Sequence, residues 1–235
     1  MRIEELEALI KSFEFVVGID EVGRGCIAGP MFVCSVVIPT NLFIKGVKDS
    51  KILSKTKREK LFPRIVENVH NIGIGVVSND EIDKFGMSIS LRLAIIKSLI
   101  NLKFLPKLII TDYVHIKNTK FGEFLETQIL DKNKRDIYLS LYNKIQKFDE
   151  KTIFNDKIYY ISIKKADRYV HANSIASIIA KVLRDRYMNH ISIKYPVYSL
   201  HKNKGYPSKE HIEAIKKYGL SNIHRKSFKL KNLIY

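Results

Sequence analysis

Two adjacent carboxylates end the first apolar run of the chain. Residues 16–19 are Val-Val-Gly-Ile, Asp20 and Glu21 follow, and Gly23-Arg24-Gly25 comes directly after them. Buried strands do not normally end in this way, because an unpaired carboxylate beside a core must be neutralised or coordinated. Glycines let a backbone approach a ligand closely, and arginine is suited to phosphate contact. The segment therefore indicates metal-dependent phosphate chemistry.

Two further carboxylates follow apolar runs. Asp112 ends the run 108–111, and Asp167 lies between an expected strand at 157–163 and an expected helix at 172–190. Each also has a purely structural explanation, since Asp112 can cap a strand end and Asp167 can interact with a helix dipole. For Asp185, which lies between two arginines, we favour a structural salt bridge.

Three or four carboxylates without a His or Cys cluster favour a hard cation, Mg²⁺ or Mn²⁺. The seven histidines lack zinc-site spacing, and no P-loop motif occurs. Adjacent side chains of a regular strand point to opposite faces. We therefore expect the chain to leave strand geometry at Glu21, so that Asp20 and Glu21 reach one metal site.

The composition favours a polyanionic partner. The 235 residues include 41 Lys and Arg against 24 Asp and Glu, a net charge of +17. The charge is concentrated at residues 201–235, where nine Lys and Arg face two Glu. The chain lacks a signal-peptide pattern and an apolar run of the roughly 20 residues that a membrane span needs, so we expect a cytoplasmic protein. Cys26 and Cys34 are expected to be buried thiols; a redox-switch disulfide stays open.

Apolar periodicity predicts an α/β fold. Expected strands cover 13–19, 31–38 and 71–77 as an antiparallel meander, then 108–111 and 157–163. Expected helices cover 54–69, 88–102, 120–130, 138–147, 172–190 and 208–218. This order indicates a mixed sheet with a C-terminal helical appendix.

Several of these segments together resemble the ribonuclease HII family, the type 2 ribonucleases H. The resemblance covers residues 14 to about 229 and rests on five ordered motifs: residues 18–25 with Ala28-Gly29-Pro30, residues 49–54, Lys165-Ala166-Asp167 ten residues before Ser177, His201 with Lys204-Gly205-Tyr206, and residues 224–228. It implies a ribonuclease H-like fold with a five-stranded mixed sheet flanked by helices. We expect residues 1–194 to form the catalytic core and 195–235 a basic helical segment near the substrate groove.

The resemblance also implies an activity and a set of site residues. Catalytic and metal-binding roles fall to Asp20, Glu21, Asp112 and Asp167, with Mg²⁺ or Mn²⁺ as cofactor. Substrate binding falls to Gly23, Arg24, Gly25, Lys51 and Tyr206, of which the tyrosine is expected to stack at an RNA–DNA junction. The implied reaction is endonucleolytic hydrolysis of RNA in RNA–DNA hybrids, with incision 5′ to single ribonucleotides in duplex DNA, as in ribonucleotide excision repair and DNA replication. We expect a monomer that binds nucleic acid and no membrane.

Two other interpretations stay open at this point. One is a ribonuclease HIII-like or resolvase-like nuclease on a related fold, although Arg24 favours type 2. The other is a catalytically silent nucleic-acid-binding protein, which retention of all four acids disfavours. The tail 227–235 shows no sliding-clamp motif, and 132–156 matches no family motif. Asn173 stands where the family usually has a small or β-branched residue, and Tyr113 where bacterial members usually have Gly.

Overall fold

The computed structural model describes residues 2–48, 50–148 and 157–228. Asp49 of the second motif, the end of the segment 132–156 and most of the tail lie outside these residues. The strands are β1 (Phe15–Val22), β2 (Met31–Pro39), β3 (Asn71–Val77), β4 (Leu108–Asp112), β5 (Ile145–Lys147) and β6 (Ile158–Ile163). The helices are α1 (Ile3–Lys11), α2 (Lys55–Asn68), α3 (Asn79–Ile100), α4 (Thr119–Thr127), α5 (Lys132–Lys144), α6 (Ala166–Tyr169), α7 (His171–Ile191), the 3₁₀ turn η1 (Pro196–Tyr198), α8 (Leu200–Asn203) and α9 (Lys209–Tyr218).

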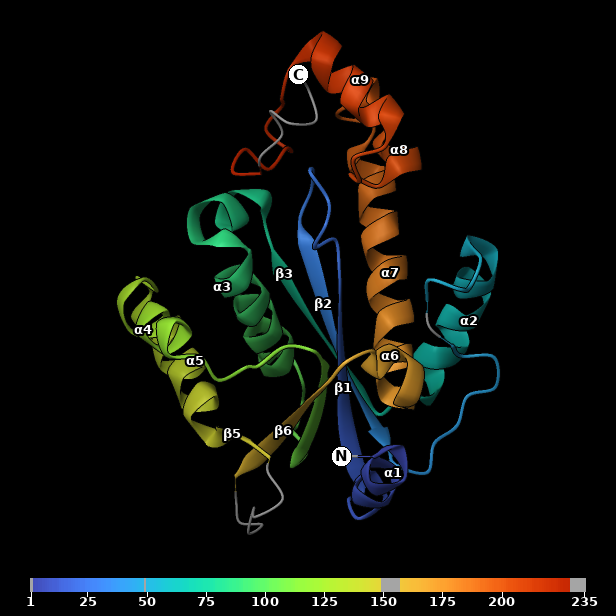
Figure 1. The fold of residues 1–235 in the computed structure, drawn as a ribbon, viewed down its shortest axis with the longest axis vertical. Helices are drawn as coiled ribbons and strands as arrows, with labels where there is room; N and C mark the ends of the chain where they lie inside the picture. Colours follow the sequence, from blue (N-terminus) through green and yellow to red (C-terminus); the bar gives the residue numbers. More distant parts are fainter. Residues whose placement is uncertain (1, 49, 149–156, 229–235) are drawn as a thin grey trace.

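One mixed sheet runs in the order β3-β2-β1-β4-β6-β5. The antiparallel meander of the first three strands is confirmed, and β1, β4, β6 and β5 pair in parallel. Helices α2 and α7 lie on one side of the sheet, and α3, α4 and α5 lie on the other (Figure 1). Because helices cover both faces of the sheet, the sequences of β1 and β2 are nearly continuous apolar runs.

Within the described part of the chain the sheet has six strands, so the expectation of five is wrong. The sequence pattern places residues 145–147 in a helix, but α5 ends at Lys144 and the chain continues as the short edge strand β5 beside β6. Three residues are too few to show a strand periodicity. Helix α3 also begins nine residues before the expected start at 88, because Gly86 (φ 74°) joins two helical segments across a kink.

The C-terminal elements η1, α8 and α9 lie beyond the end of α7 (Figure 1). They share a small apolar cluster with residues 27–28 of the loop after β1 and with Met188 of α7. The division into domains 1–194 and 195–235 stays a prediction. None of the helices in the described residues is long and apolar enough to cross a membrane.

Candidate active site

Strand β1 carries the first two carboxylates. Asp20 pairs with Cys34 of β2, Glu21 pairs with Val33, and the strand continues to Val22. The expectation that the chain leaves strand geometry at Glu21 is therefore wrong. Asp20 lies on the α7 face of the sheet and Glu21 on the opposite face. Both nevertheless line one cavity, because that cavity surrounds the carboxyl end of the strand.

Asp112 ends the neighbouring strand. The parallel register Ile19↔Thr111 brings the next residues, Asp20 and Asp112, to adjacent strand ends. The Asp112 Oδ1 atom accepts hydrogen bonds from the backbone N–H of Lys165 (2.6 Å) and Ala166 (3.4 Å). These contacts connect the end of β4 to the start of α6.

Asp167 lies in α6, the short helix between β6 and α7. Its side chain is buried, and its Oδ2 atom is 3.2 Å from Lys51 Nζ. Ser174 Oγ donates to the Asp167 carbonyl at 2.8 Å, which anchors α6 to α7. Asp167 lines a second cavity beside the first, and Lys51 connects its carboxylate to the first cavity.

The first cavity has a volume of about 330 Å³ and contains most of the residues predicted from the sequence. The predicted residues that line it are Asp20, Glu21, Gly23, Arg24, Gly25, Lys51, Asp112 and Tyr206. Four other polar lining residues were not predicted: Ser50, Arg58, Ser177 and Lys181. For the last two a signal existed, because polar residues recur four positions apart along the otherwise apolar start of α7.

The carboxylates of β1 repel one another in a buried setting. Burial, and then the charge of Glu21, raises the pKa of Asp20 well above its usual value, although a hydrogen bond from Ser177 opposes the rise. Burial likewise raises the pKa of Glu21, while Arg24 lowers it and Asp112 raises it further. Burial thus disfavours the ionised carboxylates, and a divalent cation bound beside them would favour the ionised forms.

The donor set fits a hard divalent cation, because it consists of carboxylate oxygens. In this conformation no group of three or more His, Cys, Asp or Glu side chains among the described residues is arranged to hold a metal ion. The reason is visible at two of the acids, since Asp112 accepts backbone N–H groups and Asp167 contacts Lys51. A metal ion held by all four acids would therefore need these side chains to rearrange.

Two buried arginines hold the loop between β1 and β2, which begins with the Gly-Arg-Gly turn. Arg184 of α7 donates to the carbonyls of Pro30, Ala28 and Lys204 at 2.8–3.2 Å. Arg225 donates to the carbonyls of Gly29 and Arg24 at 2.8–3.1 Å. Gly23 has a φ of 95°, and a Cβ atom there would lie 2.3 Å from Arg184 Nε. Only glycine therefore fits at this point of the turn.

Tyr206 borders the turn on the side of the C-terminal elements. Burial raises the pKa of its hydroxyl to about 12, so the side chain is a neutral phenol at any physiological pH. Lys181 Nζ lies 5.8 Å from the ring centroid and the Arg184 guanidinium lies 6.0 Å from it. A partly exposed ring thus lies in the same cavity as the carboxylates.

Two predictions about neighbouring residues are confirmed. Asp185 makes ion pairs with Lys181 (2.7 Å) and Arg58 (3.8 Å). Cys26 and Cys34 are buried free thiols. Burial raises the pKa of both.

Comparison with known proteins decides the family. A ribonuclease HII family model matches residues 17–231. The chain is 37% identical over 232 residues to a ribonuclease HII of Caldicellulosiruptor bescii, an alignment that covers 99% of this chain and 94% of the relative. The chain belongs to the ribonuclease HII family. It is therefore a nuclease that hydrolyses the RNA strand of RNA–DNA hybrids, and its substrate is nucleic acid.

Solved structures agree with this assignment. The ribonuclease H2 of Pyrococcus horikoshii OT3 superposes with a TM-score of 0.66 at 27% identity, covering 94% of this chain and 96% of that one. A ribonuclease HIII, Bst-RNase HIII in complex with Mn²⁺, superposes with a TM-score of 0.61 at 21% identity, covering 96% of this chain and 71% of that one. The second likeness shows the fold alone. The ribonuclease H-like fold expected from the sequence is confirmed.

Proposed function

We propose that this ribonuclease HII incises duplex DNA 5′ to single embedded ribonucleotides, in addition to cutting RNA–DNA hybrids, and leaves 5′-phosphate and 3′-hydroxyl ends. The observation that carries the proposal is one cavity that holds carboxylates, the Gly-Arg-Gly turn and Tyr206 together. A single ribonucleotide differs from its neighbours only by its 2′-OH. Backbone groups held rigidly at Gly23–Gly25 suit recognition of that hydroxyl.

We assign a separate role to each group of residues in and beside the cavity. Asp20, Glu21, Asp112 and Asp167 would hold the metal, at the carboxyl ends of β1 and β4 and in α6. Two Mg²⁺ or Mn²⁺ ions bound there would supply an activated water and stabilise the leaving 3′ oxygen. Arg24 and Lys51 contact the phosphates of the cleaved strand, and Tyr206 stacks beside the junction.

The decisive experiment uses a labelled DNA duplex with one ribonucleotide and a labelled RNA–DNA hybrid, each incubated with Mg²⁺, Mn²⁺ or EDTA. We expect a metal-dependent nick directly 5′ to the ribonucleotide. Cleavage of the hybrid without cleavage of the single ribonucleotide would remove the junction roles of Gly23–Gly25 and Tyr206. The metal site would stand in that case.

Asp20→Asn tests the metal ligand. We expect cleavage to fall at least about a hundredfold, because a charge-stabilising group is lost. Binding should stay nearly constant, because lysines and arginines carry the affinity for phosphates. Without metal the variant should resist urea better than wild type, since the buried, repelled carboxylate is gone. Asp136→Asn, an exposed acid on α5, is the matched control, and wild-type cleavage by Asp20→Asn would overturn the assignment.

A further inference from the structure

A second cavity of about 650 Å³ lies beside the acidic one, and the loop before α2 and helix α7 line both. In the loop before α2, Lys48 and Ile52 line the second cavity, whereas Lys51 lines the acidic cavity. In α6, Asp167 lines the second cavity while its carboxylate meets Lys51. The two cavities therefore adjoin each other at Lys51 and Asp167.

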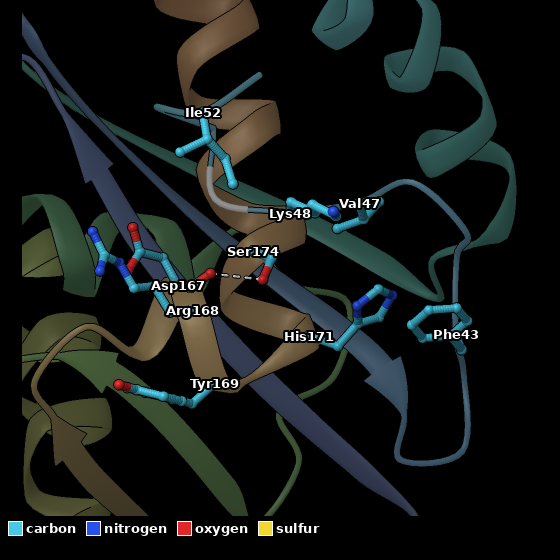
Figure 2. A pocket seen from close by; sticks show the side chains of 9 residues that line it. All are labelled: Phe43, Val47, Lys48, Ile52, Asp167, Arg168, Tyr169, His171 and Ser174. Carbon is cyan, nitrogen blue, oxygen red and sulfur yellow. Dashed lines mark hydrogen bonds between the residues drawn. The ribbon is translucent and has the colours of Figure 1, made fainter.

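Aromatic rings stand at the edges of this second cavity. Phe43 is 74% exposed and Tyr169 is 49% exposed. Figure 2 shows Phe43 and His171 on one side and Arg168 and Tyr169 on the other. Both side chains therefore present apolar ring surface to solvent at the edge of the cavity.

One of these rings is held in place. Phe43 stacks on His171 with ring centroids 5.0 Å apart and an interplanar angle of 26°. The backbone N–H of Ile44 donates to His171 Nε2 at 2.9 Å, which fixes the imidazole under the phenyl ring. A pre-ordered ring loses little conformational entropy when a ligand stacks on it.

Two cationic residues, Lys48 and Arg168, also line the second cavity. Cations that meet phosphates, together with rings on which bases stack, are the elements of sites for single-stranded nucleic acid. Stacking on such a ring requires a base with a free face. Inside a continuous duplex both faces of each base are covered by its neighbours, so this site favours an unpaired nucleotide over a paired one.

We propose that the second cavity binds an unpaired nucleotide of the strand that is cut at the acidic site. The base stacks against Tyr169 and Phe43, and the adjoining phosphate lies near Lys48 and Arg168. The enzyme thereby prefers ribonucleotides next to a single-stranded segment, such as a flap or a frayed end. This inference rests on the proposed function, because it takes the acidic cavity as the place of cleavage.

The experiment compares labelled duplexes that carry one ribonucleotide. One duplex is blunt. In the others the strand that contains the ribonucleotide continues as an unpaired extension, on the 5′ or the 3′ side of the ribonucleotide. The number of base pairs between the ribonucleotide and the start of the extension varies from one duplex to the next. Fluorescence anisotropy in EDTA gives the dissociation constants without cleavage. We expect an extension of one polarity to tighten binding about tenfold, the gain from one stacked base. No gain with either polarity would overturn the proposal.

Variants test whether the gain in affinity depends on the second cavity. Tyr169→Ala and Phe43→Leu should remove the gain and leave blunt-duplex affinity unchanged, whereas Tyr169→Phe should keep it. Lys48→Gln should reduce the salt dependence of binding to the extended duplex by about one released counterion. The control is Tyr218→Ala, a 50% exposed ring on α9 that lines neither cavity. A gain that survives Tyr169→Ala and Phe43→Leu would also overturn the proposal.

Two further measurements separate the possible failures. Metal-dependent nicking of the blunt duplex tests the proposed function alone, so a protein that nicks normally but shows no extension gain refutes only the second cavity. The mass of the protein in solution tests another occupant of the cavity. A wild-type dimer that Phe43→Leu converts to a monomer would show that a second copy of the chain covers this surface, and would refute the nucleotide site.

Discussion

Asn173 offers the sharpest test of how the fold sets the position of the carboxylates. Its side chain is fully buried on α7, and its Nδ2 atom donates to the carbonyls of Ile19 (2.8 Å) and Ile110 (3.0 Å). These carbonyls lie one residue before Asp20 in β1 and two residues before Asp112 in β4, so one amide connects the two strands close to the acids. We predict that Asn173→Val loosens this connection.

The expected change in stability is small. Two buried hydrogen bonds each contribute about 1 kcal/mol net, so their loss costs about 2 kcal/mol. The Oδ1 atom of the same amide is buried and has no hydrogen-bond partner among the described residues. Its removal returns about 1–3 kcal/mol of desolvation cost. The two effects offset each other, and the free energy of unfolding should change by less than about 1.5 kcal/mol.

The expected change in metal dependence is larger. If the hydrogen bonds serve to hold the strand ends together, their loss of about 2 kcal/mol corresponds to at most about a thirtyfold increase in the Mg²⁺ concentration for half-maximal cleavage. We expect an increase of about threefold to thirtyfold, within that limit. Urea unfolding and Mg²⁺ titration of the nicking rate measure both quantities on one preparation.

Ser98→Ala is the matched control. Ser98 is a fully buried polar residue on α3, on the opposite face of the sheet, and its hydroxyl bonds Ser35 Oγ at 2.6 Å. Its loss should cost about 1 kcal/mol of stability and leave the Mg²⁺ dependence unchanged. An Asn173→Val enzyme that unfolds much more easily, or that needs no more Mg²⁺ than wild type, would refute the reasoning.

Further predictions concern the C-terminal elements and the glycines. His224 is buried with its Nε2 atom 3.2 Å from that of His211, and burial, followed by the charge of His211, lowers its pKa to about 4. As the pH falls, His224 is therefore protonated in the unfolded chain before it is protonated in the folded one. The free energy of unfolding, which is highest above pH 6.5, should be lower by about 2 kcal/mol at pH 5. Urea unfolding should show a smaller decrease in the His224→Asn variant. Gly18→Ala would place a Cβ atom 2.3 Å from the backbone of Ala172 and should cost at least about 3 kcal/mol or prevent folding, as calorimetry would show. Gly25→Ala meets no atom within 4 Å among the described residues, so it should keep the melting temperature, while cleavage assays should show weaker selection for a single ribonucleotide over deoxyribonucleotides.

Local patterns are sufficient to predict most of the sheet. The apolar runs of β1 to β4 and β6 are long enough to be predicted as strands. The carboxylates of β1 and β4 are then recognised by their position at the ends of these runs. The edge strand β5 escapes prediction because three residues carry no period. The start of α3 escapes it because Gly86 interrupts the helical pattern while tertiary packing continues the helix beyond it.

The parts of the site that escaped prediction depend on contacts between distant segments. Arg225 reaches the carbonyls of Arg24 and Gly29 across about 200 residues of chain, and Arg184 reaches Ala28 and Pro30 across more than 150. No local period marks such partners. The side chains alternate along β1 as expected, but the conclusion that the strand must end at Glu21 was wrong. A cavity that surrounds a strand end is open to both faces, so two consecutive residues can line it without a break in the strand.

Helix α7 explains why these separate contacts act together. Asn173, Ser177 and Lys181 lie four residues apart and so share one face of the helix. Asn173 donates to the strand carbonyls, and Ser177 donates a hydrogen bond to Asp20. Lys181 lines the acidic cavity and forms an ion pair with Asp185. The helix lies close to β1 only because Gly18 has no side chain against its first turn. A shift of α7 would therefore move all three contacts at once. For this reason substitutions along this face should change the metal dependence of cleavage, whereas surface lysines should change its salt dependence.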